Sequence, residues 1–331
     1  MLEGPNSQGI SRRQWLALAG SAAAVGLVSG LRVRADEVPT TAPVATSVPP
    51  STAPMVKKNK RFKVAGDDLF MNARGKVKAL TTGQKCGLDG VSIDMGSMPG
   101  GKELKSELLK PEVQQQYIEA SKQTGVEIAS VAWFAMYAWV FPNLPKADEL
   151  LANWVDVLAK LDVKLGFLPL MSKDGTLHEP EHKDVFDKTV AVFKTVAPAA
   201  EKAGVVLGVE SNCNADDYKR FLDAVGSPAV RAFYNPGVGL ENKFDVYKDI
   251  KDLGKDRIAA LHLEQGSVPP EDFERRLGDG LIDFKKLRET LLEIEWGGWM
   301  SIARSRQKGT KPTDPANMTA NAKFVHEIFP E

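Results

Sequence analysis

Acidic, amide and imidazole side chains stand at or near the ends of several apolar runs in this sequence of 331 residues. Asp94 lies in GVSIDM, Glu210 ends VVLGVE, and Asn235 ends VRAFYN. His262 and Glu264 both lie in IAALHLEQG. Carboxylates and imidazoles are the groups that move protons in acid–base catalysis and that bind divalent metals. The sequence therefore offers the side chains for either chemistry, provided that the fold brings them together.

His262 and Glu264 are two residues apart within a run that we expect to be a strand. Because side chains alternate between the two faces of a strand, both point to one face, while Leu261 and Leu263 point to the other. If the leucines pack outward against helices, His262 and Glu264 face inward. There His262 is either a ligand in a site or a satisfied core residue, and the sequence leaves both interpretations open.

Glu210 and Asn235 each carry two interpretations as well. Glu210 follows Val209 at the end of its run, and an ionised carboxylate buried there needs a cation or several donors. Glu210 is therefore either a carboxylate of a functional site or half of a structural ion pair with a lysine or arginine. Asn235 precedes Pro236-Gly237, where asparagine commonly only shapes the turn.

The elements that must position these side chains alternate regularly. From Arg61 onward a short β-branched or aromatic run, a turn and an amphipathic stretch recur. Eight such units in about 270 residues predict an α/β protein with a closed (β/α)8 barrel. An open doubly wound sheet is the alternative, but no glycine-rich turn follows the first strand to hold a dinucleotide. The predicted strands are residues 62–65, 90–95, 126–134, 163–170, 205–210, 230–235, 258–264 and 298–303, and the predicted helices include 111–124, 146–161, 183–202, 216–225, 245–253 and 284–294.

A barrel of this kind carries its site at the carboxyl ends of its strands. Polar side chains near those ends should converge there, however far apart they are in the sequence. We therefore expect a site that contains Asp94, Glu210, Asn235, His262 and Glu264.

The succession VVLGVESN, VRAFYNPG, IAALHLEQG, LGDGLIDF and GGWMSIA resembles the xylose-isomerase-like TIM barrels, the sugar phosphate isomerase and epimerase superfamily. The resemblance covers the chain from about Phe62 to Phe329. It implies a divalent metal such as Mn, Mg or Zn, held by Glu, Asp, His and Glu at the ends of the fifth to eighth strands. In that family the metal polarises the oxygens of a sugar while two glutamates exchange a proton at carbon.

Matched to that family pattern, the metal site of this sequence is partly degraded. Glu210 falls on the first glutamate and His262 on the histidine. The aspartate becomes Asn235, and the last glutamate becomes Ala303, which neither binds a metal nor moves a proton. Glu264, on the same strand face as His262, could supply the missing carboxylate. The predicted metal ligands are therefore Glu210, Asn235, His262 and Glu264, with Glu210 as the acid–base residue.

The segment WFAMYAWVFPNLP, residues 133–145, follows the third predicted strand and is rich in aromatic side chains. Aromatic faces stack on the apolar side of sugar rings, and loops above a barrel mouth suit such a wall. Core packing would explain the same residues. We expect a substrate-binding surface that includes Asp94, Trp133 and Arg304.

HEPEH, residues 178–182, formally matches the His-Glu-x-x-His pattern of zinc proteases. That pattern needs both histidines one turn apart on a helix. Pro180 lies between them and is unfavourable inside a helix, which argues against a protease.

The amino-terminal part of the chain predicts export. Arg12 and Arg13 precede the mildly apolar stretch 15–31, and small residues suited to cleavage stand at positions 33 and 35. SRRQWLA resembles a twin-arginine signal, with two departures from its consensus. A retained membrane anchor is the alternative; with the signal cleaved, we expect no membrane insertion. We expect residues 1–35 to be the signal, 36–60 a flexible Pro/Thr/Ser-rich linker, and 61–331 a periplasmic or otherwise extracytoplasmic barrel.

The composition limits the partners of the chain. Hydrophobic residues make up 43% of it, enough for a large core, and the formal net charge is zero. This balance does not attract phosphate backbones, so we expect no nucleic-acid partner. Four histidines are too few for the three-metal site of the related barrel endonucleases. Cys86 and Cys213 are far apart in sequence, and we expect no disulfide framework.

These observations favour an exported, isomerase- or epimerase-like protein that acts on a small-molecule carbohydrate or an oxidised sugar derivative. The family chemistry is metal-assisted proton transfer, whereas cleavage of a keto-glycoside by elimination needs only one base and tolerates Ala303 better. The alternative is a carbohydrate-binding protein without catalysis, because several site residues of the family are replaced. The sequence does not decide between them, and it does not predict the oligomeric state.

Overall fold

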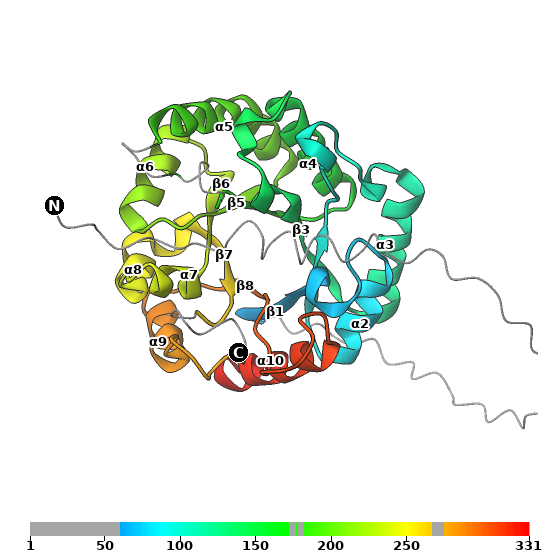
Figure 1. Ribbon diagram of the computed structural model, residues 1–331, viewed down its shortest axis with the longest axis vertical. Helices are drawn as coiled ribbons and strands as arrows, with labels where there is room; N and C mark the ends of the chain where they lie inside the picture. The colour runs from blue at the N-terminus through cyan, green and yellow to red at the C-terminus, as the bar shows by residue number, and fades with distance from the viewer. Residues whose placement is uncertain (1–59, 172–176, 178–181, 267–274, 331) are drawn as a thin grey trace, which may run out of the picture. The chain divides into compact units, whose positions relative to one another are not determined.

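Eight parallel strands close into a barrel in the computed structural model, which describes residues 60–171, 177, 182–266 and 275–330. Each strand pairs with the next along the chain, and β8 pairs with β1 to close the ring (Figure 1). The predicted (β/α)8 barrel is confirmed. The strands are β1 (Phe62–Asp67), β2 (Gly90–Asp94), β3 (Glu127–Ala132), β4 (Leu165–Pro169), β5 (Val206–Glu210), β6 (Val230–Tyr234), β7 (Ile258–Leu263) and β8 (Gly298–Ile302).

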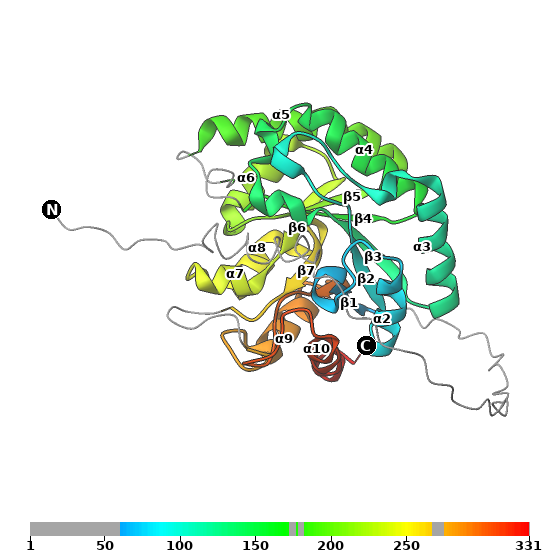
Figure 2. The ribbon, with the colours of Figure 1, turned by 45° about the vertical axis from the view of Figure 1, so that its right-hand side comes forward.

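Helices connect the strands and form a ring around the barrel (Figures 1 and 2). α3 has the predicted bounds, because Pro111 suits the first turn and Gly125 ends the helix with a φ of 72°. The described α-helices are α2 (Lys78–Cys86), α3 (Pro111–Thr124), α4 (Ala147–Lys160), α5 (Lys183–Ala203), α6 (Ala215–Val225), α7 (Pro236–Glu241), α8 (Val246–Arg257), α9 (Phe284–Glu293) and α10 (Pro315–Ile328). Short 3-10 helices are η1 (Asp68–Met71), η2 (Pro99–Gly101), η3 (Glu107–Leu109), η4 (Phe134–Ala138) and η5 (Phe141–Asn143).

The structure contains elements that the sequence did not predict. Helices α2 and α10 complete the eight predicted units, although no bounds were predicted for them. Helix α7 is additional, and β1 runs two residues beyond its predicted end at Ala65. Gly66 and Asp67 are poor strand formers, but pairing with β2 and β8 keeps them extended. The longer strand brings Asp67 into the barrel interior, where it becomes part of the site described below.

Aromatic and polar side chains occupy different parts of the barrel interior. Phe167 on β4 and Phe233 on β6 contact each other with ring centroids 4.7 Å apart. Ser92 on β2 lies between two other serines and forms hydrogen bonds of 2.8 Å with Ser130 on β3 and 2.9 Å with Ser301 on β8. A polar chain therefore crosses one side of the interior, and aromatic rings fill the other.

The outer face of β7 belongs to the hydrophobic core, as the predicted alternation required. Leu261 and Leu263 are fully buried there, whereas His262 between them bonds to carboxylates inside the barrel. Both cysteines, Cys86 and Cys213, are buried free thiols. Within the described part of the chain, no helix has the length and apolar character needed to span a membrane.

Two predictions concern segments outside the described residues. The predicted signal and all but the last residue of the predicted linker lie within residues 1–59, which the structure does not describe. Most of HEPEH lies at residues 178–181, which are also outside the description. His182 stands directly before α5 rather than within it.

Candidate active site

Glu210, the last residue of β5, lies at the centre of a buried cluster of polar side chains. Its own side chain is 0% exposed. Tyr137 donates a hydrogen bond of 2.5 Å to Oε2, and the amide of Asn235 donates one of 2.7 Å to Oε1. His262 Nδ1 lies 2.9 Å from the same Oε1. The structure thus brings together Glu210, Asn235 and His262, three of the four predicted metal ligands.

His262 lies between two carboxylates. Nδ1 faces Glu210 and Nε2 lies 2.9 Å from Asp67 Oδ2. A neutral imidazole has one N–H, so two hydrogen bonds to carboxylates require the doubly protonated ring. Burial lowers the pKa of His262, but the charges and hydrogen bonds of Glu210 and Asp67 raise it well above its ordinary value of 6.5. His262 is therefore an imidazolium that joins two buried anions.

The charge on Glu210 depends on its hydrogen-bond donors. Burial alone raises the pKa of this carboxyl, but the charge of His262 and the hydrogen bonds from His262, Tyr137 and Asn235 together lower it below 4.5. Glu210 is consequently ionised at neutral pH despite its complete burial. An ionised carboxylate with a protonated neighbour and a hydroxyl donor is equipped to accept and return a proton.

Asp67 is held from its other side by the serine chain. Ser301 donates to Asp67 Oδ1 at 2.8 Å, which leaves Oδ2 for His262. Because Ser130 donates to Ser92, the hydroxyl protons run from Ser130 through Ser92 and Ser301 toward Asp67. These donors fix the orientation of Asp67, and Asp67 in turn fixes the ring of His262.

Glu264 does not join this cluster. Its Oε2 lies 2.7 Å from Arg304 Nε, and Arg304 Nη2 donates to its Oε1 at 3.0 Å. The side chains of Glu264 and Arg304 are 6% and 12% exposed, so this is a nearly buried ion pair with one hydrogen bond. The sequence predicted that Glu264 supplies the carboxylate that is missing at Ala303. In the structure, the charge of Glu264 is already neutralised by Arg304.

The four predicted metal ligands do not fit a divalent cation in this arrangement. Both oxygens of Glu210, both ring nitrogens of His262 and both oxygens of Glu264 already have partners. Asn235 uses its amide nitrogen on Glu210 and its Oδ1 to cap α7 through the backbone N–H of Val238. Across the described residues no cluster of three or more His, Cys, Asp or Glu side chains is arranged to hold a metal. The metal site stays a prediction.

Asp94, the last residue of β2, takes part in a separate ion pair. Its Oδ2 accepts a 2.5 Å hydrogen bond from Arg74, and its backbone N–H donates to the buried Asp68. Burial raises the pKa of Asp94 above its ordinary value even though the Arg74 charge opposes this rise. Asp94 thus lies at the predicted end of the barrel, where it bonds to Arg74, Asp68 and Gly96 rather than to the Glu210 cluster.

Trp133, a predicted substrate-binding residue, lies in the hydrophobic core. Its side chain is 0% exposed and contacts the rings of Phe141 and Trp154 at centroid distances of 6.4 and 6.1 Å. This position agrees with the core-packing interpretation of the aromatic segment. The residue of that segment that reaches the site is Tyr137, which is half-buried and lies on η4.

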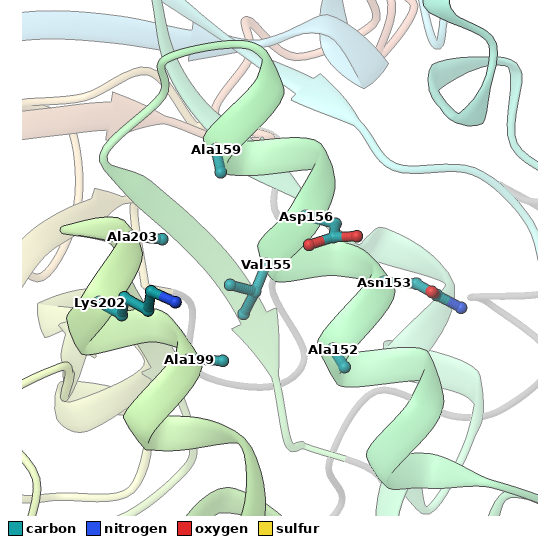
Figure 3. A pocket seen from close by; sticks show the side chains of 8 residues that line it. All are labelled: Ala152, Asn153, Val155, Asp156, Ala159, Ala199, Lys202 and Ala203. Atoms are coloured by element: carbon teal, nitrogen blue, oxygen red, sulfur yellow. The ribbon is translucent and has the colours of Figure 1, made fainter.

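Sequence reasoning missed Asp67 and Ser301 as members of the site. Asp67 lay two residues past the predicted end of the first strand. Ser301 on β8 could have been found, because it lies two residues before Ala303, which directly follows the strand, and alternation points both inward. A cavity of about 390 Å³ between α4 and α5 is unrelated to this site, since Figure 3 shows only side chains of the outer helices around it.

The chain belongs to the xylose isomerase-like TIM barrel family, whose model matches residues 81–327. Its fold is similar to that of 3-keto-D-glucoside 4-epimerase from E. coli, with a TM-score of 0.61, 15% identity, and coverage of 81% of this chain and 98% of that one. It is also similar to D-allulose 3-epimerase from Methylomonas sp. in complex with D-allulose, with a TM-score of 0.62, 18% identity, and coverage of 82% and 98%.

A curated relative is 3-oxo-isoapionate decarboxylase from Pectobacterium atrosepticum. The two chains are 27% identical over 157 residues, which cover 44% of this chain and 53% of the relative. The chain thus spans about half the length of that relative. These likenesses agree with the sugar isomerase and epimerase resemblance at the level of family and fold.

Proposed function

We propose that this protein catalyses proton transfer next to the carbonyl of a sugar or an oxidised sugar, with Glu210 as the base. The observation that carries the proposal is the ionised Glu210 at the end of β5, fully buried and bonded to Tyr137, Asn235 and His262. Three donors around one carboxylate, one of them a cation, exceed what a structural role on a strand needs. They suit a group whose charge changes during a reaction.

The names of the related proteins support a keto-sugar substrate. Two are epimerases of a 3-keto-D-glucoside and of D-allulose, and one is a decarboxylase of a 3-oxo sugar acid. Removal of a proton beside a carbonyl gives an enolate, and loss of CO2 from a 3-oxo acid gives an enolate too. The shared need is a site that forms and reprotonates an enolate, and we propose the same for this barrel.

Ala303 limits which reaction of this class the site supports. Epimerisation by two opposed glutamates needs a second proton donor, and Ala303 stands where the family pattern has that glutamate. A single base removes a proton and returns it to the same face of the substrate, or it starts the elimination of a neighbouring group. We therefore favour isomerisation or keto-glycoside elimination. No step of this proposal passes through a metal.

Solvent exchange tests the proposal without knowledge of the product. The protein is incubated in D2O with a panel of ketohexoses and 3-keto-glucosides, and loss of C–H signals is followed by NMR. We expect exchange at a carbon next to the carbonyl for at least one member, and loss of that exchange in Glu210→Gln. Exchange that survives in Glu210→Gln would remove Glu210 from the mechanism.

A non-catalytic carbohydrate-binding protein is the second candidate, favoured by the alanine at position 303. It predicts a measurable sugar affinity by calorimetry with no exchange and no product from any sugar in the same panel. We further propose, from residues 1–35, that the protein works outside the cytoplasm. Mass spectrometry of the amino terminus of the exported protein tests this location.

A further inference from the structure

Glu210 is enclosed by its own hydrogen-bond partners. Asn235 and His262 occupy Oε1, and Tyr137 occupies Oε2. Asn235 is 4% exposed, His262 is 3% exposed, and Glu210 itself is 0% exposed. A sugar at the barrel mouth therefore meets no exposed surface of the base proposed to act on it.

Tyr137 is the exception among these partners, since its side chain is half-buried. It lies on η4, in the segment that follows β3 and hence at the carboxyl end of the strands, where barrels bind substrates. Its ring contacts Phe167 inside the barrel at a centroid distance of 6.3 Å, while its neighbours Ala138 and Trp139 are half-buried as well. Tyr137 thus lies between the buried cluster and the mouth.

We infer that Tyr137 is a further catalytic residue, the group through which Glu210 exchanges a proton with the substrate. The inference rests on the proposed function. The phenol oxygen takes the proton from the substrate carbon while its own proton passes to Glu210 Oε2. One C–H bond and one O–H bond break, two O–H bonds form, and the electron pair of the C–H bond stays on the substrate as an enolate. The reverse transfer returns the proton, so no oxidant, reductant or co-reactant is needed.

The resting geometry is suited to this step. The hydroxyl already donates to Glu210 at 2.5 Å, so the acceptor of its proton is in place before the substrate arrives. His262 and Asn235 hold the other oxygen of the carboxylate and keep Oε2 turned toward Tyr137. A tyrosine that only filled space would not require this hydroxyl.

The test measures D2O exchange and sugar affinity of Tyr137→Phe beside the wild-type protein. Tyr234→Phe is the matched control, because Tyr234 also donates to a carboxylate, Asp249 at 3.0 Å, but faces away from the site. We expect Tyr137→Phe to lose about 100-fold or more in exchange rate with a sugar Kd within about threefold of wild type. We expect Tyr234→Phe to retain exchange.

Three outcomes would overturn the inference. Exchange in Tyr137→Phe within about threefold of wild type would mean that Glu210 contacts the substrate itself. Loss of sugar binding together with exchange would make Tyr137 a binding residue only. Absence of exchange in the wild-type protein with every sugar would instead remove the proposed function, and the inference with it.

A second variant covers the case in which Tyr137→Phe does not fold. Incorporation of 3-fluorotyrosine at position 137 keeps the ring and the hydroxyl but makes the hydroxyl more acidic. We expect a changed exchange rate with an unchanged sugar Kd, because the proton of this hydroxyl moves in the reaction. An identical exchange rate would contradict the inference.

Discussion

Glu210 and Glu264 stand near the ends of β5 and β7, and both are almost completely buried, but their charges are balanced in different ways. Among the described residues, Glu264 pairs with Arg304. Glu210 has a histidine, a tyrosine hydroxyl and an amide. Arginine keeps its proton at every accessible pH, whereas histidine and tyrosine can move theirs. This difference supports our proposal that Glu210 carries the proton chemistry, and it gives Glu264 a fixed structural charge.

We expect the largest effect to be on divalent metal affinity, after carboxylates are added to the predicted metal site that includes Glu210. Asn235→Asp with Ala303→Glu restores the family residues and should raise divalent metal affinity by about two orders of magnitude, since affinity follows the number of charged ligands. Calorimetric titration with Mn²⁺ measures it. The single variants are the controls. An unchanged affinity in the double variant would mean that the mouth is built differently.

The metal content of the wild-type protein tests whether the predicted ligands are available to a divalent ion. After dialysis we expect less than about a tenth of an equivalent of any divalent ion, because the donors are already bonded to protein partners. Elemental analysis measures this. A full equivalent would show that these hydrogen bonds rearrange around a metal and would restore the predicted site.

Breaking the Glu264 pair should cost stability. Arg304→Ala leaves a buried carboxylate without its cation and should lower the free energy of unfolding by about 3 kcal/mol. Urea denaturation measures it. Arg257→Ala is the control, because the pair of Arg257 with Asp223 is exposed and should contribute less than about 1 kcal/mol. Equal effects of the two substitutions would contradict the structural role of Arg304.

Asp67→Asn should affect the protonation of His262 more strongly than it affects the stability of the fold. An amide offers one acceptor, so the ring loses a carboxylate partner and its pKa falls. The stability loss should be about 1–3 kcal/mol. Ring nitrogen chemical shifts of His262 across a pH titration measure the change directly. A histidine that stays doubly protonated to the same pH in both proteins would mean that Asp67 does not hold the charge.

We expect the smallest effect to be the pH dependence of stability. The folded pKa of Glu210 lies below its unfolded value near 4.5, so its contribution is complete above that pH and is lost as the pH falls through the folded pKa. The folded pKa of His262 lies above 6.5, so its contribution is present below that pH and is lost as the pH rises through the folded pKa. The stability difference between wild type and Glu210→Gln should therefore be greatest between these limits. A difference that stays constant from pH 3 to 9 would contradict this coupling.

The barrel was predictable because its strands are nearly continuous apolar runs and several of its helices, such as α3 and α5, end at glycines. Glu210, Asn235 and His262 could be brought together from sequence because each stands near the end of a parallel strand. The extension of β1 to Asp67 was not predictable, since Gly66 and Asp67 are weak strand formers and only their pairing with β2 and β8 keeps them extended.

The partners of the site side chains were harder to predict than their positions. Tyr137 reaches Glu210 through a 3-10 turn, and sequence gives no register for such a segment. The Glu264 pair was closer to prediction, because Leu263 lies opposite Ile302 on β8 and Arg304 follows two residues later. Alternation shows which face a side chain occupies, but it does not show which partner satisfies its charge.

The most direct test of the central claim compares Glu210→Gln with Glu264→Gln in the D2O exchange measurement. With a keto-sugar that exchanges in the wild-type protein, Glu210→Gln should lose at least about 100-fold in rate, whereas Glu264→Gln should stay within about tenfold. That outcome would place the proton chemistry on Glu210. Equal losses in both variants, or a greater loss in Glu264→Gln, would contradict it.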